Sequence, residues 1–457
     1  MLSRRACVSR QRSPGVPRDP VARFRKSSAV MAHKPLRILY AAGPGDVLGT
    51  YRHWKLGQDD PTQVAMTYSG QFYDLVKEFD AQAYVIATCR TRAKLRDGNF
   101  RIEHRPVPFE NSAGLLYHLG QFWYGLRLLV SALRTGCNVA VVCAGTHWFV
   151  LALMTLFGIR VVPTVHCVLW KKFGWNPTPF QRLVHTLNGW FFTGGCAAIV
   201  SVSDEVTQQL GELTDSRARP VREFVPQYRA SSFAAVRPAD PGARPFRVLY
   251  VGRIERNKGV FDLLRLARSL EGAGAEAVEF DVCGDGSALG ELRAAISAAG
   301  LDHRLHCHGH CGRERMVDMY SRAHAVIVPT TTDFIEGFNK VVAEGVLAGR
   351  PVITSSVCPA LSYVRGSVVE VPPDDVDAYA AAIRRLRDDP AWYQTFVTAA
   401  AKNQPQFYDP QRGWAAAVRE VLLAITGDAA HDPRGAPRPI DQAPAPRWAT
   451  HPVGKSP

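Results

Sequence analysis

Short apolar runs alternate with amphipathic segments in two successive stretches of this chain. The runs have the length of buried parallel strands, and the segments between them show helical periodicity. The expected strands are 36–42, 84–88, 139–144, 160–165 and 197–202 in the first stretch, and 246–252, 279–283, 304–308 and 325–329 in the second. Such alternation predicts an α/β protein with two doubly wound, Rossmann-like domains that face each other across a cleft.

The amphipathic segments predict the helices between these strands. They are 72–79, 114–134, 148–157, a segment from about 259, 288–299, 313–322, and a segment that begins at 339 or 340. Ser203 is expected to cap the helix that follows it, because its hydroxyl can accept from the free N–H groups of the first turn. Residues 46–71 are polar with several aromatics, so we expect a long functional loop there.

Prolines mark the boundary between the two series. Residues 216–244 change composition and carry repeated prolines, as a domain linker does. We therefore expect a first, acceptor-side domain at 35–228, a linker at 229–245 and a second, donor-binding domain at 246–390. Helices over 391–426, interrupted at Pro405 and Pro410, are expected to follow. The Arg-, Ser- and Pro-rich segment 1–34 and the Pro/Ala-rich tail 427–457 are expected to be disordered.

The net charge of +14 is concentrated at one end of the chain. Residues 1–34 carry nine Lys/Arg and one Asp, and the tail from Gly427 carries four Lys/Arg and three Asp. The intervening residues therefore hold only about +5, which gives no reason to expect a nucleic-acid partner. A mildly positive body suits phosphate-bearing or anionic partners.

Targeting and redox features are sparse. The first 30 residues lack the apolar core of a secretory signal, and no run of 18 apolar residues predicts a membrane span. The ten cysteines include no C-x-x-C and suit reduced thiols of a cytoplasmic protein. The aromatic-rich segment 114–134 is expected to pack into the core, with a peripheral surface on the inner face of a membrane as the alternative.

The stretch 330–349 follows a buried strand, crosses a Thr-rich loop and enters a helix. Glu336 lies in the loop, and Glu344 lies eight residues later, inside the helix. Between them, the N–H groups of the first turn form an anion site at the positive end of the helix dipole. Two carboxylates that flank an anion site suit the hydroxyls and phosphates of a sugar nucleotide. The alternative is an ordinary amphipathic helix with two unrelated glutamates.

Other candidate residues stand at the carboxyl ends of expected strands, where open α/β sheets bind ligands. Gly43 and Gly45 follow the first strand. His166 follows the fourth, and the loop after it offers tryptophan faces for sugars and lysines for an anionic acceptor. Arg253 and Lys258 follow the first strand of the second series and could neutralise a diphosphate. The loop residues in question are Trp170, Lys171, Lys172 and Trp175.

Two further motifs could be mistaken for metal sites. Asp375 and Asp377 follow two prolines at a helix start, where capping is the better explanation. The segment from His306 to Cys311 is rich in metal-binding side chains, but its spacing matches no common zinc pattern. On a strand, His306, His308 and His310 would share one face. We therefore predict no catalytic metal, and no cofactor.

These motifs resemble glycosyltransferase family 4. The resemblance rests on Gly252-Arg253 to Lys258-Gly259, on Cys283-Gly-Asp-Gly286, on Glu336-Gly-Phe-Asn-Lys-Val-Val-Ala-Glu344 and on Gly349-Arg-Pro-Val-Ile353. It is strong over 246–390 and weaker over 36–228. It implies a GT-B fold whose last helix returns to the first domain, and a retaining transfer from a nucleotide-sugar to a glycan, lipid-linked or small-molecule acceptor.

The resemblance also implies roles for single residues. Arg253 and Lys258 would hold the donor diphosphate, and Glu344 the ribose hydroxyls. Glu336 and His166 would contact the transferred sugar. The remaining donor-binding residues would be Gly43, Gly45, Gly284, Gly286, Gly337, Phe338, Asn339 and Lys340. Asn339 and Lys340 stand where many members of the family have proline and an aliphatic residue.

The expected reaction has the acceptor hydroxyl attack the face from which the diphosphate departs, with the leaving phosphate taking the proton. The motifs leave open whether the donor is a UDP- or a GDP-sugar. Two other classes of protein share the fold: nucleotide-sugar epimerases or phosphorylases, and binding proteins without transfer activity. Products formed without an acceptor would distinguish them.

Overall fold

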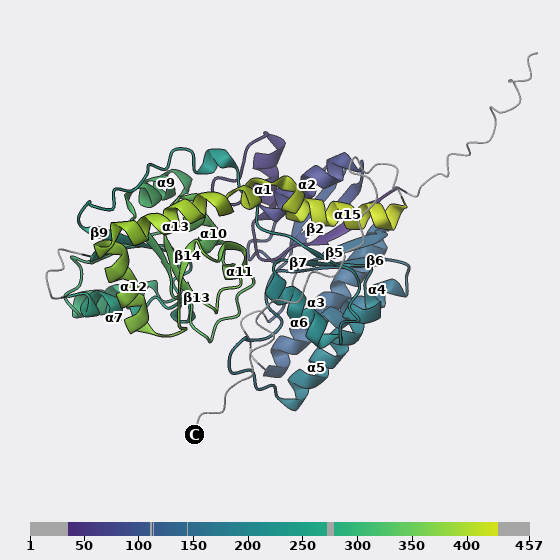
Figure 1. Ribbon diagram of the computed structural model, residues 1–457. Coiled ribbons are helices and arrows are strands. Elements are labelled where there is room, and N and C mark those ends of the chain that lie inside the picture. The colour runs from purple at the N-terminus through teal and green to yellow at the C-terminus, as the bar shows by residue number, and fades with distance from the viewer. Residues whose placement is uncertain (1–34, 110–111, 113, 144, 272–277, 428–457) are drawn as a thin grey trace, which may run out of the picture. The chain divides into compact units, whose positions relative to one another are not determined.

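The computed structural model describes residues 35–109, 112, 114–143, 145–271 and 278–427 (Figure 1). From Leu36 onward these residues belong to one compact unit. The expected basic extension and all of the expected tail except Gly427 lie outside the described residues.

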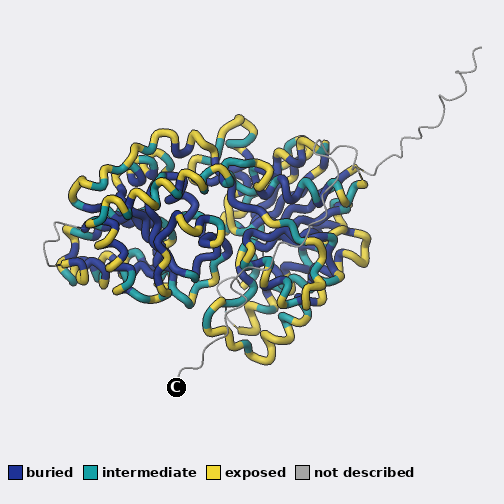
Figure 2. Tube along the Cα trace, in the orientation of Figure 1, coloured by how far each residue is buried: buried dark blue, intermediate teal, exposed yellow. Residues whose placement is uncertain are grey.

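The first sheet has eight strands in the order β3-β4-β2-β1-β5-β6-β7-β8. Neighbouring strands are parallel, except that β3 and β4 form an antiparallel pair. The strands are β1 (Arg37–Ala41), β2 (Gln82–Ala87), β3 (Lys94–Asp97), β4 (Phe100–His104), β5 (Val139–Val142), β6 (Arg160–Val165), β7 (Ile199–Ser201) and β8 (Val221–Glu223). The central strands are buried, as Figure 2 shows.

The second sheet has six parallel strands in the order β11-β10-β9-β12-β13-β14. They are β9 (Phe246–Val251), β10 (Val278–Cys283), β11 (Leu305–Gly309), β12 (Ala325–Val328), β13 (Val352–Ser355) and β14 (Val368–Val371). Two parallel α/β sheets confirm the predicted fold class. The sequence did not reveal β3, β4, β8, β13 and β14.

Helices connect the strands of both sheets. Those of the first sheet are α1 (Val47–Lys55), α2 (Tyr68–Glu78), α3 (Gly114–Thr135), α4 (Ala152–Thr155), α5 (Pro179–Trp190) and α6 (Asp204–Leu213), with the short turns η2 (Trp148–Leu151), η3 (Phe191–Gly195) and η4 (Ala230–Ser232). Those of the second are η5 (Arg256–Lys258), α7 (Asp262–Ser269), α8 (Leu289–Ala298), α9 (Arg313–Arg322), α10 (Lys340–Leu347), α11 (Leu361–Val364) and α12 (Val376–Asp388). None of the helices in the described ranges is long and apolar enough to cross a membrane.

Local capping chemistry sets several of these boundaries. The Ser203 hydroxyl accepts from the N–H of Val206 at 3.4 Å and begins α6, as predicted. Asp375 accepts from the N–H of Ala378 at 2.9 Å and begins α12, so this carboxylate has the expected capping role.

The prediction of a long loop over 46–71 is correct for residues 56–67 and wrong elsewhere, because α1 and the start of α2 occupy the rest of this range. Asp46 caps α1 by accepting from the N–H of Gly49 at 2.7 Å. Tyr51 is buried one turn after Val47, so the few apolar residues of α1 lie on one face. The count of polar residues concealed this amphipathic pattern.

The change in composition that begins at residue 216 starts within the first sheet, before the expected linker. Residues 221–223 form β8, the last strand of the first sheet. The boundaries at 228 and 390 remain predictions.

The last helices of the described chain contact helices that belong to both sheets. They are α13 (Pro390–Asn403), α14 (Pro405–Tyr408), η6 (Pro410–Arg412) and α15 (Trp414–Thr426), with interruptions at the predicted prolines. Helix α13 contacts α10 and α12, while α15 contacts α2 (Figure 1). Arg419 of α15 pairs with Glu78 of α2 at 2.7 Å. The terminal helix thus returns to the first sheet, as the resemblance implied.

Helix α3 differs from the expectation that its aromatics pack into the core. Tyr124 and Leu128 are fully buried, but Leu116, Phe122 and Trp123 are 51%, 41% and 56% exposed. The prediction is therefore correct for one face of α3 and wrong for the other. Hydrophobic periodicity cannot reveal this, because both faces of the helix are apolar.

Candidate active site

The loop between β12 and α10 carries the first of the two glutamates singled out in the sequence. Gly337, Phe338 and Asn339 are buried at its end, and Asn339 has a φ of 66°. Helix α10 starts at Lys340, as predicted, and no side chain caps its start. The N–H groups of its first turn are therefore suited to bind an anion.

Lys258 forms an ion pair with Glu336, and their side chains are only 14% and 16% exposed. The Lys258 ammonium lies 3.8 Å from the centroid of the Phe334 ring. The guanidinium carbon of Arg253 lies 5.7 Å from the same centroid. The structure thus brings Arg253 and Lys258 to one aromatic ring and Glu336 to Lys258. The sequence did not single out Phe334, because nothing local marks it.

Glycines allow the backbones of the loops after β9 and β10 to lie close to each other. A Cβ on Gly284 would come within 1.8 Å of the carbonyl oxygen of Gly252. A Cβ on Gly286 would come within 2.4 Å of the carbonyl oxygen of Ile254. These glycines therefore support the loop that carries Arg253, and direct contact with a donor remains a prediction for them.

Glu344 is buried inside α10, where it accepts a hydrogen bond from the Tyr320 hydroxyl at 3.0 Å. Burial raises the pKa of Glu344 to about 7, although the Tyr320 hydrogen bond and the charge of Lys340 both act to lower it. Burial lowers the pKa of Lys340. Glu344 and Lys340 are thus two ionisable groups with shifted pKa values on one helix, a feature common at binding and catalytic sites.

His166 follows β6 and meets the donor loop directly. Its Nε2 lies 2.6 Å from the Thr164 hydroxyl, while its Nδ1 is buried without a hydrogen-bond partner among the described residues. Burial, together with the charge of Lys340, lowers the pKa of His166 to about 3, so the ring is neutral at physiological pH. A Cβ on Gly337 would come within 1.8 Å of the His166 carbonyl oxygen.

A cavity of about 760 Å³ opens over the carboxyl ends of the first sheet's strands. Gly43, Gly45, His166 and Lys340 all line it. A Cβ on either of these two glycines would meet nothing within 4 Å, so their turn is open to a ligand. Tyr68 lies in the same wall, 4.6 Å from the His166 ring and 4.9 Å from the Lys340 ammonium. Tyr68 lies within the segment 46–71 that was predicted to be a loop, so its place in this wall was not predicted.

The loop after His166 does not offer free lysines to an acceptor. Lys171 pairs with Asp333 at 3.0 Å, and Lys172 pairs with Glu205 at 2.8 Å. The two tryptophans of this loop, Trp170 and Trp175, stack on each other with centroids 6.4 Å apart and line a different cavity. The expectation that these lysines face an anionic acceptor is therefore not met.

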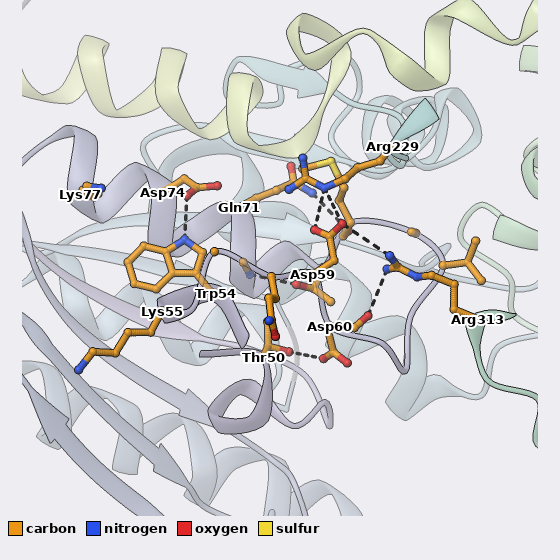
Figure 3. A pocket seen from close by; sticks show the side chains of 17 residues that line it. Thr50, Trp54, Lys55, Asp59, Asp60, Gln71, Asp74, Lys77, Arg229 and Arg313 are labelled. Carbon is orange, nitrogen blue, oxygen red and sulfur yellow. Dashed lines mark hydrogen bonds and ion pairs between the residues drawn. The ribbon is translucent and has the colours of Figure 1, made fainter. Parts of the chain in front are cut away.

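Another cavity, of about 500 Å³, lies beside α1 and α2 (Figure 3). Asp59 pairs with Arg229 at 2.6 Å and lies 3.6 Å from Arg313. Thr50 donates a hydrogen bond to Asp60 at 2.7 Å. Asp59 is thus already paired with arginines, and no predicted site residue lines this cavity, so we assign it no catalytic part.

The histidines of β11 lie against carboxylates of β10 in the second sheet. His306 lies 3.1 Å from Glu279, and His308 lies 2.6 Å from Asp281. These two share a face as predicted, but β11 ends before His310. In the part of the chain that the structure describes, no group of three or more His, Cys, Asp or Glu is placed to hold a metal ion.

The buried Glu344 predicts a pH-dependent stability. Its pKa is 4.5 ordinarily and about 7 in the folded chain, so the folded state binds this proton more tightly than the unfolded state. The resulting stabilisation is complete below about pH 4.5 and is lost as the pH rises through about 7. Compared with Glu344→Gln, the unliganded wild type should lose about 3 kcal/mol of unfolding free energy between pH 5 and 8.

Urea unfolding at both pH values measures this difference. Glu314→Gln, at an exposed position of α9, serves as the control and should follow the wild type. Parallel pH profiles for wild type and Glu344→Gln would contradict the burial argument.

Two doubly wound sheets joined by a returning helix define the GT-B class of glycosyltransferases. Sucrose-phosphate synthase from Thermosynechococcus elongatus matches the structure with a TM-score of 0.63 at 18% identity, covering 86% of this chain and 100% of that chain. A HepE protein of Anabaena, solved in complex with UDP, matches with a TM-score of 0.58 at 15% identity, covering 86% and 100%. The chain has the GT-B fold.

The sequence comparisons agree with this fold. Residues 237–403 match the family model described as glycosyl transferases group 1. Glycogen synthase of Mycobacterium tuberculosis is 28% identical over 298 residues, which are 62% of this chain and 68% of the relative. D-inositol 3-phosphate glycosyltransferase 1 of Catenulispora acidiphila is 31% identical over 202 residues, covering 42% and 46%. The protein is a hexosyltransferase-type glycosyltransferase.

Proposed function

We propose that this chain transfers a hexosyl group from a UDP- or GDP-sugar to a glycan, lipid-linked or small-molecule acceptor, with retention of anomeric configuration and without a metal ion. One observation carries this proposal: Arg253 and Lys258 lie at the ring of Phe334, and Lys258 pairs with Glu336. Phe334 and Glu336 belong to the loop that leads to the uncapped start of α10. Cations, a carboxylate and free N–H groups are the partners that a nucleoside diphosphate-sugar requires.

The diphosphate would bind to Arg253, Lys258 and the first-turn N–H groups of α10. Lys258 now pairs with Glu336, and a phosphate would compete for the ammonium. This exchange would free the Glu336 carboxylate to accept hydrogen bonds from the sugar hydroxyls. The arrangement therefore couples donor binding to the preparation of the sugar contact.

The nucleoside would be held through Glu344 and the loops after β9 and β10. Glu344 would accept from the ribose hydroxyls, as in the resembled family. Gly284 and Gly286 would keep the loop surface open, while Gly337, Phe338 and Asn339 would present their backbone to the sugar. Lys340 forms no ion pair within 4 Å in the described residues, which would leave its ammonium available to a phosphate.

In the transfer step, the bond between the anomeric carbon and the leaving phosphate oxygen breaks, and the acceptor oxygen bonds to the same face. Arg253 and Lys258 would stabilise the negative charge that develops on the diphosphate. The leaving phosphate would accept the acceptor's proton. His166, neutral because its pKa is lowered to about 3, would orient the sugar by hydrogen bonding rather than donate a proton.

Metal independence follows in this proposal from the two fixed cations. In metal-dependent transfer, a divalent ion neutralises the diphosphate. Here Arg253 and Lys258 would supply two positive charges to the same group, so a chelator should not lower the rate.

Product analysis tests the proposal. The chain is incubated with UDP- and GDP-hexoses and a panel of acceptors, with and without EDTA, and the anomeric configuration of the product is read by NMR. Chelator-insensitive transfer or slow donor hydrolysis with retention is expected. Inversion would contradict the proposed retention, and dependence on a divalent ion would contradict the proposed metal independence. An epimerised donor would indicate an epimerase, and binding without any turnover would indicate a binding protein.

We further propose a cytoplasmic location and no nucleic-acid partner. The described cysteines are free, and Cys143 and Cys283 are buried, which suits a reducing compartment. Cell fractionation should find the protein in the cytoplasm or on the cytoplasmic face of a membrane.

A further inference from the structure

Exposed apolar side chains gather in one part of the described chain. Of the eighteen large apolar side chains that are exposed there, sixteen lie between Phe109 and Trp190. The second sheet and its helices contribute only Ile335. Scattered single residues of this kind are normal, but a concentration within one segment indicates an interaction surface.

Helix α3 supplies the central stripe of this surface. Leu115, Leu119, Phe122, Val130 and Leu133 are all exposed, at 71%, 50%, 41%, 42% and 42%. At 3.6 residues per turn, these positions fall on one side of the helix, opposite the buried residues. The side of α3 that faces away from the core is thus apolar along the whole helix.

The neighbouring helices extend the stripe. Leu156 and Phe157, just after α4, are 76% and 58% exposed, and Leu183 and Trp190 of α5 are 54% and 62% exposed. Both α3 and α5 contact η2, which α4 continues. His118 of α3 lies against α5 as well. We call the exposed apolar residues of α3, α4 and α5 the α3–α5 surface.

The charge of this segment has one sign. Residues 112–203 contain no Asp or Glu, although the chain has 41 of them, while they contain four Arg and two Lys. The two lysines pair with acidic residues outside the segment. Within the described residues, none of the four arginines has an ion pair, and Arg134 and Arg182 are exposed beside the apolar stripe.

Exposed apolar side chains next to exposed arginines favour one kind of partner for the α3–α5 surface. A second copy of the chain offers no acid from α3, α4 or α5 to pair with these arginines, and segment 1–34 carries nine Lys/Arg and one Asp and would be repelled too. A bilayer with anionic head groups offers hydrocarbon for the apolar side chains and negative charge for the arginines. We propose that the α3–α5 surface docks on an anionic lipid bilayer.

Docking here would bring the bilayer close to the large cavity. Tyr117 and Gln121 of α3 line the same cavity as His166. A membrane-embedded acceptor could then reach the cavity from the docked bilayer. This last step rests on the proposed function, whereas the docking itself does not.

Vesicle flotation with the full chain tests the docking. Without nucleotide, the chain should bind phosphatidylcholine vesicles that contain phosphatidylglycerol at least about tenfold more strongly than phosphatidylcholine alone. Leu119→Glu/Phe122→Glu should lower binding to the anionic vesicles at least about tenfold. Leu56→Glu, at an exposed leucine at the end of α1, should bind as the wild type does. Thermal unfolding of each variant verifies the fold.

A second pair of variants tests the charge. Arg134→Gln/Arg182→Gln should reduce the preference for anionic vesicles, while Arg268→Gln, at an exposed position of α7, should retain it. No binding by the wild type, or undiminished binding by Leu119→Glu/Phe122→Glu, would overturn the proposal. So would a dimer in solution that this variant abolishes. Flotation without any glycosyl transfer would leave the docking standing and contradict only the proposed function.

Discussion

Arg253→Ala is expected to lower kcat by about 10²–10³-fold, the usual effect of removing one preorganised charge contact. The Arg253 side chain is exposed and stands beside Lys258 at the Phe334 ring. Its backbone is held independently, since the Tyr250 hydroxyl donates to the Arg253 carbonyl oxygen at 2.9 Å. The variant should therefore fold normally and lose stabilisation of the departing diphosphate.

Arg256→Ala is the matched control for this experiment. Arg256 lies three residues later in the same loop, but it pairs with Glu291 and covers the Phe261 ring at 4.5 Å. Its loss should leave kcat within about twofold of the wild type. Near-normal turnover in Arg253→Ala would exclude the role proposed for this guanidinium.

Gly337→Ala is expected to lower turnover by about 10²-fold while nucleotide affinity stays close to that of the wild type. The new Cβ would stand 1.8 Å from the His166 carbonyl oxygen, so the donor loop must shift away from the end of β6. A displacement of about 1 Å at a reacting centre costs roughly this factor. Arg253 and Lys258 belong to the segment after β9 and not to the displaced loop, so we expect them to keep their contacts with the diphosphate.

The control for this variant is Gly290→Ala, where a Cβ meets nothing within 4 Å. It should change neither quantity. Measurement of kcat and of nucleotide affinity for both variants separates the two effects. Unchanged turnover in Gly337→Ala would mean that the contact with His166 is absent from the catalytic state.

Local signals made much of this structure predictable. The start of α10 and the caps at Ser203 and Asp375 depend on residues within one turn, and the sequence identified all three. The buried strands were recognisable because their apolar runs are continuous, as in β5 and β12.

Contacts between distant residues were not predictable in the same way. Lys258 and Glu336 are 78 positions apart, and no local pattern indicates that they pair. Tyr68 meets His166 and Lys340 only because α2 and α10 converge on one cavity. The outward face of α3 was mispredicted for a related reason. An apolar pattern identifies side chains that can pack into a core, but it does not show whether another element covers them.

The central claim is that Arg253, Lys258, Glu336 and Glu344 form a working nucleotide-sugar site. A thermal-shift panel with UDP, GDP, ADP and their sugar conjugates, each with and without a chelator, tests it most directly. A ligand at one hundred times its Kd adds about 2.7 kcal/mol to the unfolding free energy. We expect a chelator-insensitive shift with one nucleotide family, reduced in Glu344→Ala. No shift with any of these nucleotides would contradict the assignment of the donor site.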